Sequence, residues 1–193
     1  MTMKPTLLII EGIDRIGKTT FCNKLQNDIE LNHKRKAIYF KDSIQLNTLG
    51  NFSVDILDKK HLGYCLGVCD VLSQLAITQF PKPVYILDRF HITGAVYAKV
   101  LRNNYKPLMQ NNTIEKVLQD KFDVKLVTFY LTTHVTNEDE VVSIENLEKL
   151  NDAFYEVTNN SSLPNLKCPL IGDENGMTDI LEYSSAVINF TLG

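Results

Sequence analysis

Residues 12–19 read Gly12-Ile13-Asp14-Arg15-Ile16-Gly17-Lys18-Thr19 and match the pattern G-x-x-x-x-G-K-[ST] at every fixed position. The apolar run 7–10 before this stretch predicts a strand that is buried on both faces. After it, Phe21, Leu25 and Ile29 recur every four residues and predict a helix over 18–32. A strand, a glycine-containing loop and a helix in this order predict a site for the phosphates of a nucleoside triphosphate.

The residue types in this loop suit phosphate chemistry. Gly12 and Gly17 let the backbone curl so that its N–H groups point at phosphate oxygens. The positive end of the helix adds to this attraction, and Lys18 supplies a mobile charge for the β- and γ-phosphates. The hydroxyl of Thr19 can bind Mg²⁺. The loop therefore predicts a nucleotide and magnesium, but not what happens to the phosphate.

The rest of the chain alternates between short apolar runs and longer amphipathic stretches. Strands are expected at 7–10, 37–40, 84–87 and 126–131, helices at 18–32, 62–80, 113–121 and 144–157, and 186–190 fits either a strand or the end of a helix. This alternation predicts an α/β protein with the three-layer P-loop NTPase fold, a mainly parallel sheet flanked by helices on both faces. We expect a single domain over 1–193, with a mobile lid at about 132–146.

Ligands of such sheets bind at the carboxyl ends of the strands, which singles out the loops after Ile10 and Leu87. The second of these loops opens with Asp88-Arg89-Phe90. An aspartate there can hold Mg²⁺ or orient the attacking oxygen, and an arginine can grip a second phosphate through two hydrogen bonds. An Asp-Arg pair alone is more typical of a surface ion pair, but its place after the third strand favours a phosphate site.

Arg15 lies inside the phosphate loop and allows two interpretations. It can fold over a transferred phosphoryl group and stabilise its charge, or it can face the solvent. The segment 132–157, where a lid over the phosphates would lie, is acidic and contains no arginine. If a transition-state arginine comes from the nucleotide side, Arg15 is the best candidate.

Composition excludes several other classes of protein. The 193 residues carry 20 basic and 23 acidic side chains, a net charge of -3, which disfavours a nucleic-acid binder. No run approaches the roughly 20 apolar residues that are needed to cross a membrane. The four cysteines lack the spacing of a metal site, and they predict reduced, mostly buried thiols in a cytoplasmic protein.

Three groups of residues together resemble one family. Residues 11–20 are similar to the loop E-G-x-D-x-x-G-K-[ST]-[ST] of the thymidylate kinases, and Asp88-Arg89-Phe90 is similar to their D-R-[YF] motif. Thr93, Gly94 and Tyr97 lie where that family carries a Ser or Thr, a small residue and an aromatic ring. Arg15 with an arginine-free lid resembles the branch whose catalytic arginine lies in the phosphate loop.

The resemblance implies roles on the nucleotide side. Arg15 would stabilise the moving phosphoryl group, and Thr19 and Asp88 would serve the magnesium ion. The implied catalytic residues are Arg15, Lys18, Asp88 and Arg89. The implied ATP-binding residues are Gly12, Ile13, Asp14, Arg15, Ile16, Gly17, Lys18, Thr19 and Thr20.

The resemblance also implies roles on the acceptor side. Asp14 would contact the 3′-hydroxyl of the acceptor's sugar, Arg89 would hold its monophosphate, and Tyr97 would pack on the base or sugar. The implied acceptor-binding residues are Asp14, Lys41, Asp70, Arg89, Thr93, Gly94 and Tyr97. A homodimer is implied as well.

Two positions depart from the family pattern. Only Lys41 stands where the family places an arginine after its second strand. The helix before Asp88 lacks the family's base-binding arginine, and Gly67 stands in place of the stacking phenylalanine. Either Asp70 reads a different base edge or Tyr64 packs from another angle, and Asp70 is as readily an ordinary charge on a helix surface.

These patterns lead to one hypothesis and two alternatives. We expect a deoxynucleoside monophosphate kinase that transfers the γ-phosphoryl of ATP, with dTMP as the first candidate acceptor. One alternative is a deoxynucleoside kinase that acts on a 5′-hydroxyl. The other is a non-catalytic regulatory module that binds a nucleoside triphosphate and has no acceptor.

Overall fold

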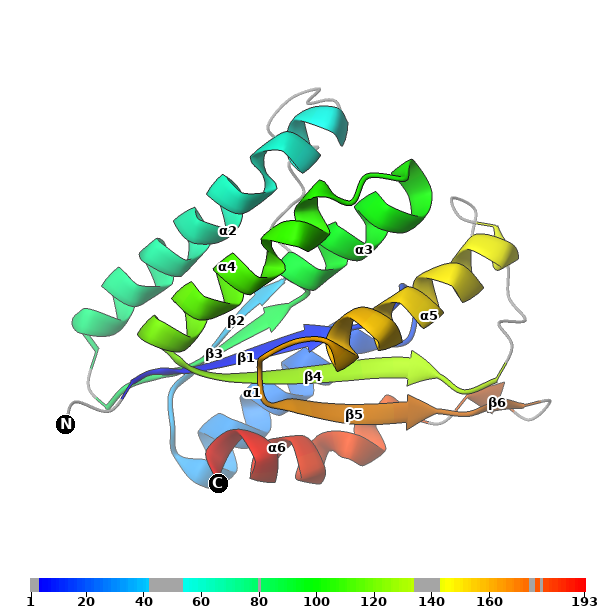
Figure 1. Ribbon diagram of the computed structural model, residues 1–193. Coiled ribbons are helices and arrows are strands. Elements are labelled where there is room, and N and C mark those ends of the chain that lie inside the picture. Colours follow the sequence, from blue (N-terminus) through cyan, green and yellow to red (C-terminus); the bar gives the residue numbers. More distant parts are fainter. Residues whose placement is uncertain (1–3, 42–53, 80, 134–142, 174–175, 178) are drawn as a thin grey trace.

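Five parallel strands form the central sheet of the computed structural model (Figure 1), which describes residues 4–41, 54–79, 81–133, 143–173, 176–177 and 179–193. The strand order is β2-β3-β1-β4-β5. The bounds are β1 Thr6–Glu11, β2 Ala37–Lys41, β3 Val84–Asp88, β4 Asp123–Leu131 and β5 Asn165–Leu170. Every residue of β1 is buried, as its apolar run predicts for the middle strand of a parallel sheet.

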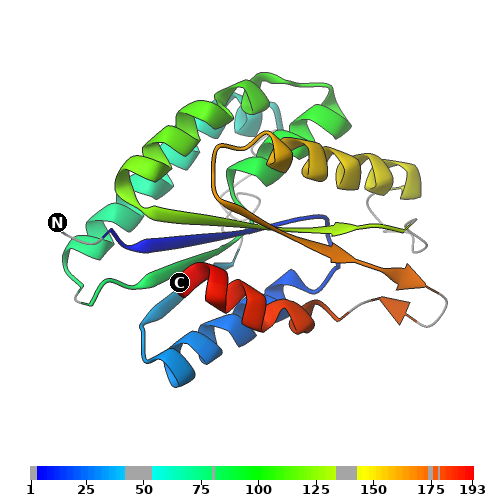
Figure 2. The ribbon, with the colours of Figure 1, turned by 60° about the horizontal axis from the view of Figure 1, so that its bottom comes forward.

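Helices cover both faces of the sheet (Figures 1 and 2). One face carries α1 (Lys18–His33) and α6 (Ser184–Leu192). The other carries α2 (Val54–Ile77), α3 (His91–Arg102), α4 (Lys106–Lys121) and α5 (Ile144–Asn159). A short antiparallel pair, β6 (Gly172–Asp173) and β7 (Gly176–Met177), and a 3₁₀ helix, η2 (Ile180–Tyr183), lead into α6. The predicted three-layer α/β fold is confirmed. In the described part of the chain, no helix is long and apolar enough to span a membrane.

Four segments differ from the sequence-based expectation. Helix α2 ends at Ile77 and begins eight residues before the predicted start at 62, and helix α4 begins at Lys106, seven residues before the predicted start at 113. The stretch 186–190, which fitted either a strand or the end of a helix, belongs to helix α6. Strand β5 was not expected, because Lys167 and Pro169 interrupt its apolar pattern; an edge strand tolerates both. Helix α3 was not expected either, and it places Thr93, Gly94 and Tyr97 on a helix instead of in a loop.

The pairing of β1 with β3 brings the two predicted loops together. These strands are parallel, and Ile10 is in register with Asp88. On the far side of β3, Asp88 is in register with Lys41 at the end of β2. The carboxyl ends of three strands therefore present the phosphate loop, Lys41 and the Asp88-Arg89 segment at one edge.

All four cysteines are free and buried, as predicted: Cys22, Cys65, Cys69 and Cys168. Burial raises the pKa of each thiol, to about 11 for Cys69 and about 12 for Cys168. These thiols therefore remain protonated at neutral pH and pack as small apolar side chains.

The start of α3 is anchored by the buried carboxylate of Glu115 on α4. This carboxylate lies 3.5 Å from the Nε2 atom of His91 and accepts hydrogen bonds from the hydroxyls of Ser161 and Ser162, both at 2.7 Å. It also accepts the backbone N–H of Ser162 at 2.8 Å. Burial raises the pKa of Glu115, but the hydrogen bonds from His91 and the serines outweigh it and lower the pKa to about 2. The carboxylate thus ties α4 to α3 and to the turn before β5.

We expect Glu115 to make stability depend on pH. Its pKa is about 2 in the folded protein against 4.5 ordinarily, so its stabilising effect is full above pH 5 and is lost as the pH falls toward 2. The shift corresponds to roughly 3 kcal/mol of unfolding free energy. Urea unfolding of the protein and of Glu115→Gln at pH 5, 4, 3 and 2.5 isolates this contribution from the other carboxylates. The difference between the two curves should shrink with acid; parallel curves would contradict the assignment.

Candidate active site

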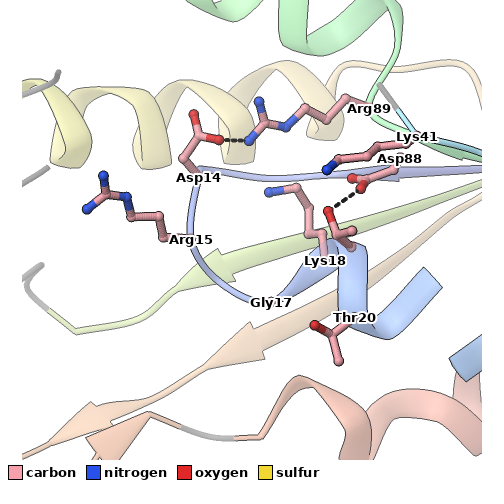
Figure 3. Close-up of a pocket in the computed structure, with 9 residues that line it drawn as sticks. Asp14, Arg15, Gly17, Lys18, Thr20, Lys41, Asp88 and Arg89 are labelled. Carbon is pink, nitrogen blue, oxygen red and sulfur yellow. Dashed lines mark hydrogen bonds and ion pairs between the residues drawn. The ribbon is translucent and has the colours of Figure 1, made fainter. Parts of the chain in front are cut away.

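A cavity of about 530 Å³ lies where the carboxyl ends of β1, β2 and β3 meet (Figure 3). Its nine lining residues come from the phosphate loop, the start of α1 and the ends of β2 and β3: Asp14, Arg15, Gly17, Lys18, Thr19, Thr20, Lys41, Asp88 and Arg89. All nine were predicted as site residues from the sequence. The cavity has a cationic interior, because Lys18, Lys41 and Arg89 extend into it from three different elements (Figure 3).

The loop adopts a backbone that requires its two glycines. Gly12 has a φ of 143°, and a Cβ atom there would lie 2.4 Å from the carbonyl oxygen of Phe129. Gly17 has a φ of 86° and forms the N-cap of α1. Ile13 and Ile16 are buried and anchor the loop against the core, while the other loop residues from Asp14 onward and the first turn of α1 line the cavity.

The buried side chain of Lys18 reaches back across the loop. It is 4% exposed, and its amine donates a hydrogen bond to the backbone carbonyl of Ile13. This bond holds the charge inside the curve of the loop, where phosphate oxygens would approach. Arg15 behaves differently: it is exposed, has a φ of 63°, and its guanidinium points away from the Lys18 amine at the outer edge of the cavity (Figure 3).

Thr19 and Asp88 form the part of the cavity that suits a magnesium ion. The Thr19 hydroxyl donates to the Asp88 carboxylate at 2.7 Å, and the Tyr39 hydroxyl donates to the same oxygen at 3.1 Å. Burial and the negative charge of Asp88 raise the pKa of Tyr39, so this hydroxyl stays a donor. No group of three His, Cys, Asp or Glu side chains that could hold a metal occurs in the described ranges. A hydroxyl and one carboxylate fit Mg²⁺, which takes its remaining oxygens from phosphates and water.

Arg89, Asp14 and Tyr97 meet at the other end of the cavity. The guanidinium of Arg89 forms an ion pair with one oxygen of Asp14, and the Tyr97 hydroxyl donates to the other oxygen. Arg89 itself has a φ of 73°, and its N–H donates to the carbonyl of Ile10 at 2.8 Å. Three of the residues expected to bind an acceptor are therefore joined directly to each other.

A second, apolar hollow of about 460 Å³ lies between α2 and the ends of β2 and β3. We call it the α2 groove; its lining residues are Phe40, Gly63, Tyr64, Gly67, Val68, Val71, Leu72 and Leu87. A Cβ atom built on Gly63 or Gly67 meets no atom within 4 Å, so the two glycines leave the hollow open. Phe40 and Leu87 each immediately precede a residue of the cationic cavity, Lys41 and Asp88.

Comparison with solved structures places this arrangement among known folds. Thymidylate kinase from Candida albicans has a TM-score of 0.60 and 18% identity, over 96% of this chain and 92% of that one. Thymidylate kinase from Ehrlichia chaffeensis has a TM-score of 0.56 and 15% identity, over 96% and 98% of the two chains. This chain has the thymidylate kinase fold.

A third solved structure is less similar in fold, and the comparisons with family models and curated proteins found no match. The YorR protein of Bacillus subtilis, solved in complex with phosphorylated GDP, has a TM-score of 0.51 and 21% identity, over 84% of this chain and 85% of that one. No protein-family model matches the chain, and no curated protein matches it. The assignment to the thymidylate kinase fold therefore rests on structure.

Four predicted acceptor residues do not line the cationic cavity of this thymidylate kinase fold: Asp70, Thr93, Gly94 and Tyr97, of which Tyr97 reaches it through Asp14. Thr93 and Gly94 face inward on α3: the Thr93 hydroxyl donates to Glu11, and a Cβ on Gly94 would lie 2.7 Å from the ring of His61. Asp70 is exposed on α2 and pairs with Lys121 of α4 at 2.9 Å. The sequence left two roles open for Asp70, a contact with a base edge and an ordinary surface charge. The ion pair with Lys121 and the exposure of the carboxylate favour the surface charge.

The predicted lid falls mostly outside the described residues, which omit 134–142. At its far end Ser143 is the N-cap of α5 and accepts the N–H of Asn146 at 3.4 Å. Sequence reasoning quoted Glu11 only as the first residue of the loop motif and gave it no role, and it missed Tyr39. The alternation of β2 places Tyr39 on the same face as Lys41, which is a signal that could have found it.

Proposed function

We propose that this protein is an ATP-dependent deoxynucleoside monophosphate kinase, with dTMP as the first candidate acceptor. One observation carries the proposal: the phosphate loop and a second set of cations, Lys41 and Arg89, line the same cavity. A site that only binds or hydrolyses a triphosphate needs the first set alone. The second set supplies a grip for a second, separate phosphate.

The nucleotide half of the site binds the triphosphate of ATP. The loop amides and the N-terminus of α1 surround the phosphates, and Lys18 exchanges the carbonyl of Ile13 for phosphate oxygens. Thr19 and Asp88 would hold Mg²⁺, directly and through water. When bound, the ion neutralises charge that builds up on the β- and γ-phosphates.

The acceptor half binds a monophosphate. The guanidinium of Arg89 binds the carboxylate of Asp14 in this structure. A planar guanidinium binds the oxygens of a phosphate equally well. Lys41 lies beside Asp88 and faces the same space (Figure 3). Asp14, held by Tyr97, is then placed to contact a sugar hydroxyl. A phosphate oxygen is already anionic at neutral pH, so the transfer needs no general base.

Arg15 is the group that we assign to the transferring phosphoryl. From the outer edge of the cavity its long side chain can turn over the loop toward the γ-phosphate. Catalysis then consists of positioning and of neutralising charge, since the loose transition state spreads negative charge over three oxygens. The protein would be a single domain, with the segment at about 132–146 acting as its lid.

An ADP-release assay with ATP and Mg²⁺ tests this function. The acceptors tested are the deoxynucleoside monophosphates, including dTMP, then the corresponding ribonucleoside monophosphates, and finally the free nucleosides. We expect turnover with monophosphates only. Turnover with nucleosides alone would favour the deoxynucleoside kinase and remove the role of Arg89; no acceptor-dependent turnover would leave the regulatory module.

We place the acceptor's base in the α2 groove. The groove adjoins the cationic cavity through Phe40 and Leu87 and offers apolar contact to a flat ring. In the family that the sequence resembles, this helix carries the base-binding residues, and here Gly67 leaves the space open. Base recognition would then depend on size and apolar contact more than on hydrogen bonds.

Filling the groove should change acceptor choice. Gly67→Phe places a ring in open space, and we expect it to lower kcat/KM for purine monophosphates about tenfold more than for pyrimidine ones, a difference of roughly 1.4 kcal/mol. The KM for ATP should stay within twofold. Gln74→Phe adds the same ring on an exposed position of α2 outside the groove and serves as the control. An unchanged purine-to-pyrimidine ratio in Gly67→Phe would remove the base from this groove.

We also propose a cytoplasmic homodimer, as the resemblance implies. Support comes from the end of α2, where Leu75 and Ile77 lie outside the α2 groove and are exposed, at 41% and 68% of their residue surface. Light scattering at several protein concentrations measures the mass in solution and tests this assembly.

A further inference from the structure

Glu11, the last residue of β1, carries a fully buried carboxylate beneath the acceptor half of the site. One carboxylate oxygen accepts the backbone N–H of Phe90 at 3.0 Å, and the other accepts the hydroxyl of Thr93. Phe90 is the N-cap of α3 and offers no side-chain cap of its own. Glu11 therefore caps α3 from another element, at the end where a negative charge is favoured.

Two hydrogen bonds to the end of β1 fix the backbone on either side of Arg89. Its N–H donates to the carbonyl of Ile10, and the next N–H along the chain, that of Phe90, donates to Glu11. Between these two bonds Arg89 holds a φ of 73°, a left-handed conformation that an arginine rarely adopts. Such a conformation persists only where neighbouring contacts fix it. It aims the guanidinium at Asp14 and into the cavity.

Burying a carboxylate costs free energy unless hydrogen bonds or an opposite charge compensate for it. The hydrogen bonds that Glu11 accepts provide this compensation and indicate a structural role. Burial raises the pKa of Glu11 above its ordinary value, and the hydrogen bonds of Thr93 and Phe90 and the nearby His91 offset this rise only in part. A neutral side chain could fill the same space. The carboxylate is the group that can accept both donors while facing the positive end of α3.

We propose that Glu11 is a positioning residue for the acceptor: by capping α3 and fixing the backbone at Arg89, it holds the guanidinium where it receives the acceptor's phosphate. Glu11 does not line the cationic cavity, so it acts through Arg89. The predicted effect on the acceptor KM rests on the proposed kinase function. The predicted effect on the backbone at Arg89 and Phe90 does not, because hydrogen exchange measures it without turnover.

Glu11→Gln keeps the shape of the side chain and removes its charge. We expect the KM for the acceptor monophosphate to rise about tenfold, with kcat and the KM for ATP within twofold. Amide hydrogen exchange at Phe90 should accelerate by at least tenfold. Thr93→Val removes one of the two donors and should give a smaller change in the same direction; it also tests the proposal if Glu11→Gln does not fold.

Glu30→Gln is the matched control, because the Glu30 carboxylate also accepts a backbone N–H, that of Ala37 at 3.2 Å, at the opposite end of β2 from Lys41. It should leave the acceptor KM and the hydrogen exchange at Phe90 unchanged. Equal acceptor KM values for Glu11→Gln and the parent, or unchanged exchange at Phe90, would overturn the positioning role. If the parent turns over no acceptor, the proposed function fails, and the exchange measurement still decides whether Glu11 fixes this turn.

Discussion

Replacement of Arg15 by alanine should lower kcat by about a thousandfold and change the KM of both substrates by less than threefold. An arginine that stabilises a transferring phosphoryl group contributes about 10³- to 10⁵-fold to kcat. The segment 132–157 contains no arginine that could take over this role. Steady-state kinetics over both substrates, with product release checked by a single-turnover experiment, measures the effect.

Two variants separate the effect of the Arg15 guanidinium on kcat from the effect of its backbone conformation. Arg15 has a φ of 63°, which glycine adopts without strain, so Arg15→Gly removes the side chain and relaxes the loop. An equal loss of kcat in the alanine and glycine variants assigns the effect to the guanidinium. Arg35→Ala, in which the lost guanidinium contacts Thr6 away from the cavity, should retain full activity. A parental kcat in Arg15→Ala would refute the assigned role.

Replacement of Arg89 by alanine should raise the KM for the acceptor monophosphate about a hundredfold. A hydrogen-bonded charge contributes roughly 1.5–3 kcal/mol, and 1.4 kcal/mol is a factor of ten. The KM for ATP should remain within twofold, because Lys18 and the loop amides bind that substrate independently. Both constants come from one initial-rate matrix in which the two substrates are varied.

Lysine at position 89 provides the graded test. Arg89→Lys keeps the charge and loses the two-pronged geometry, so its KM should lie between those of the parent and the alanine variant. A larger effect on the KM for ATP than on that for the acceptor would reverse the assignment of the two halves of the cavity. Arg35→Ala again serves as the control for the loss of an arginine.

The phosphate loop could be predicted because its constraints are local. Gly12 and Gly17 adopt positive φ values, and Lys18 bonds to a residue five positions away. Lys41 was assigned to the acceptor through the family resemblance alone, and the pairing of β2 with β3 places it in register with Asp88.

Other features could not be predicted because their causes lie far away in the chain. Helix α3 lacks a local start signal, since its cap comes from Glu11, 79 residues before Phe90. The direction of Asp70 depends on the rotation of α2 about its own axis, which packing against α4 fixes. A periodic pattern shows that a helix has an apolar face, but not which polar residue meets which neighbour.

The burial of the four thiols has a practical consequence for spectroscopy. All of them are enclosed and protonated at neutral pH, so the native chain should react slowly with maleimides and similar reagents. A single cysteine introduced on the surface, for example at Gln74 on α2 or at Lys149 on α5, would be the one fast-reacting position. Fluorophores or spin labels at two such positions can then follow changes in distance during turnover without removal of any native cysteine.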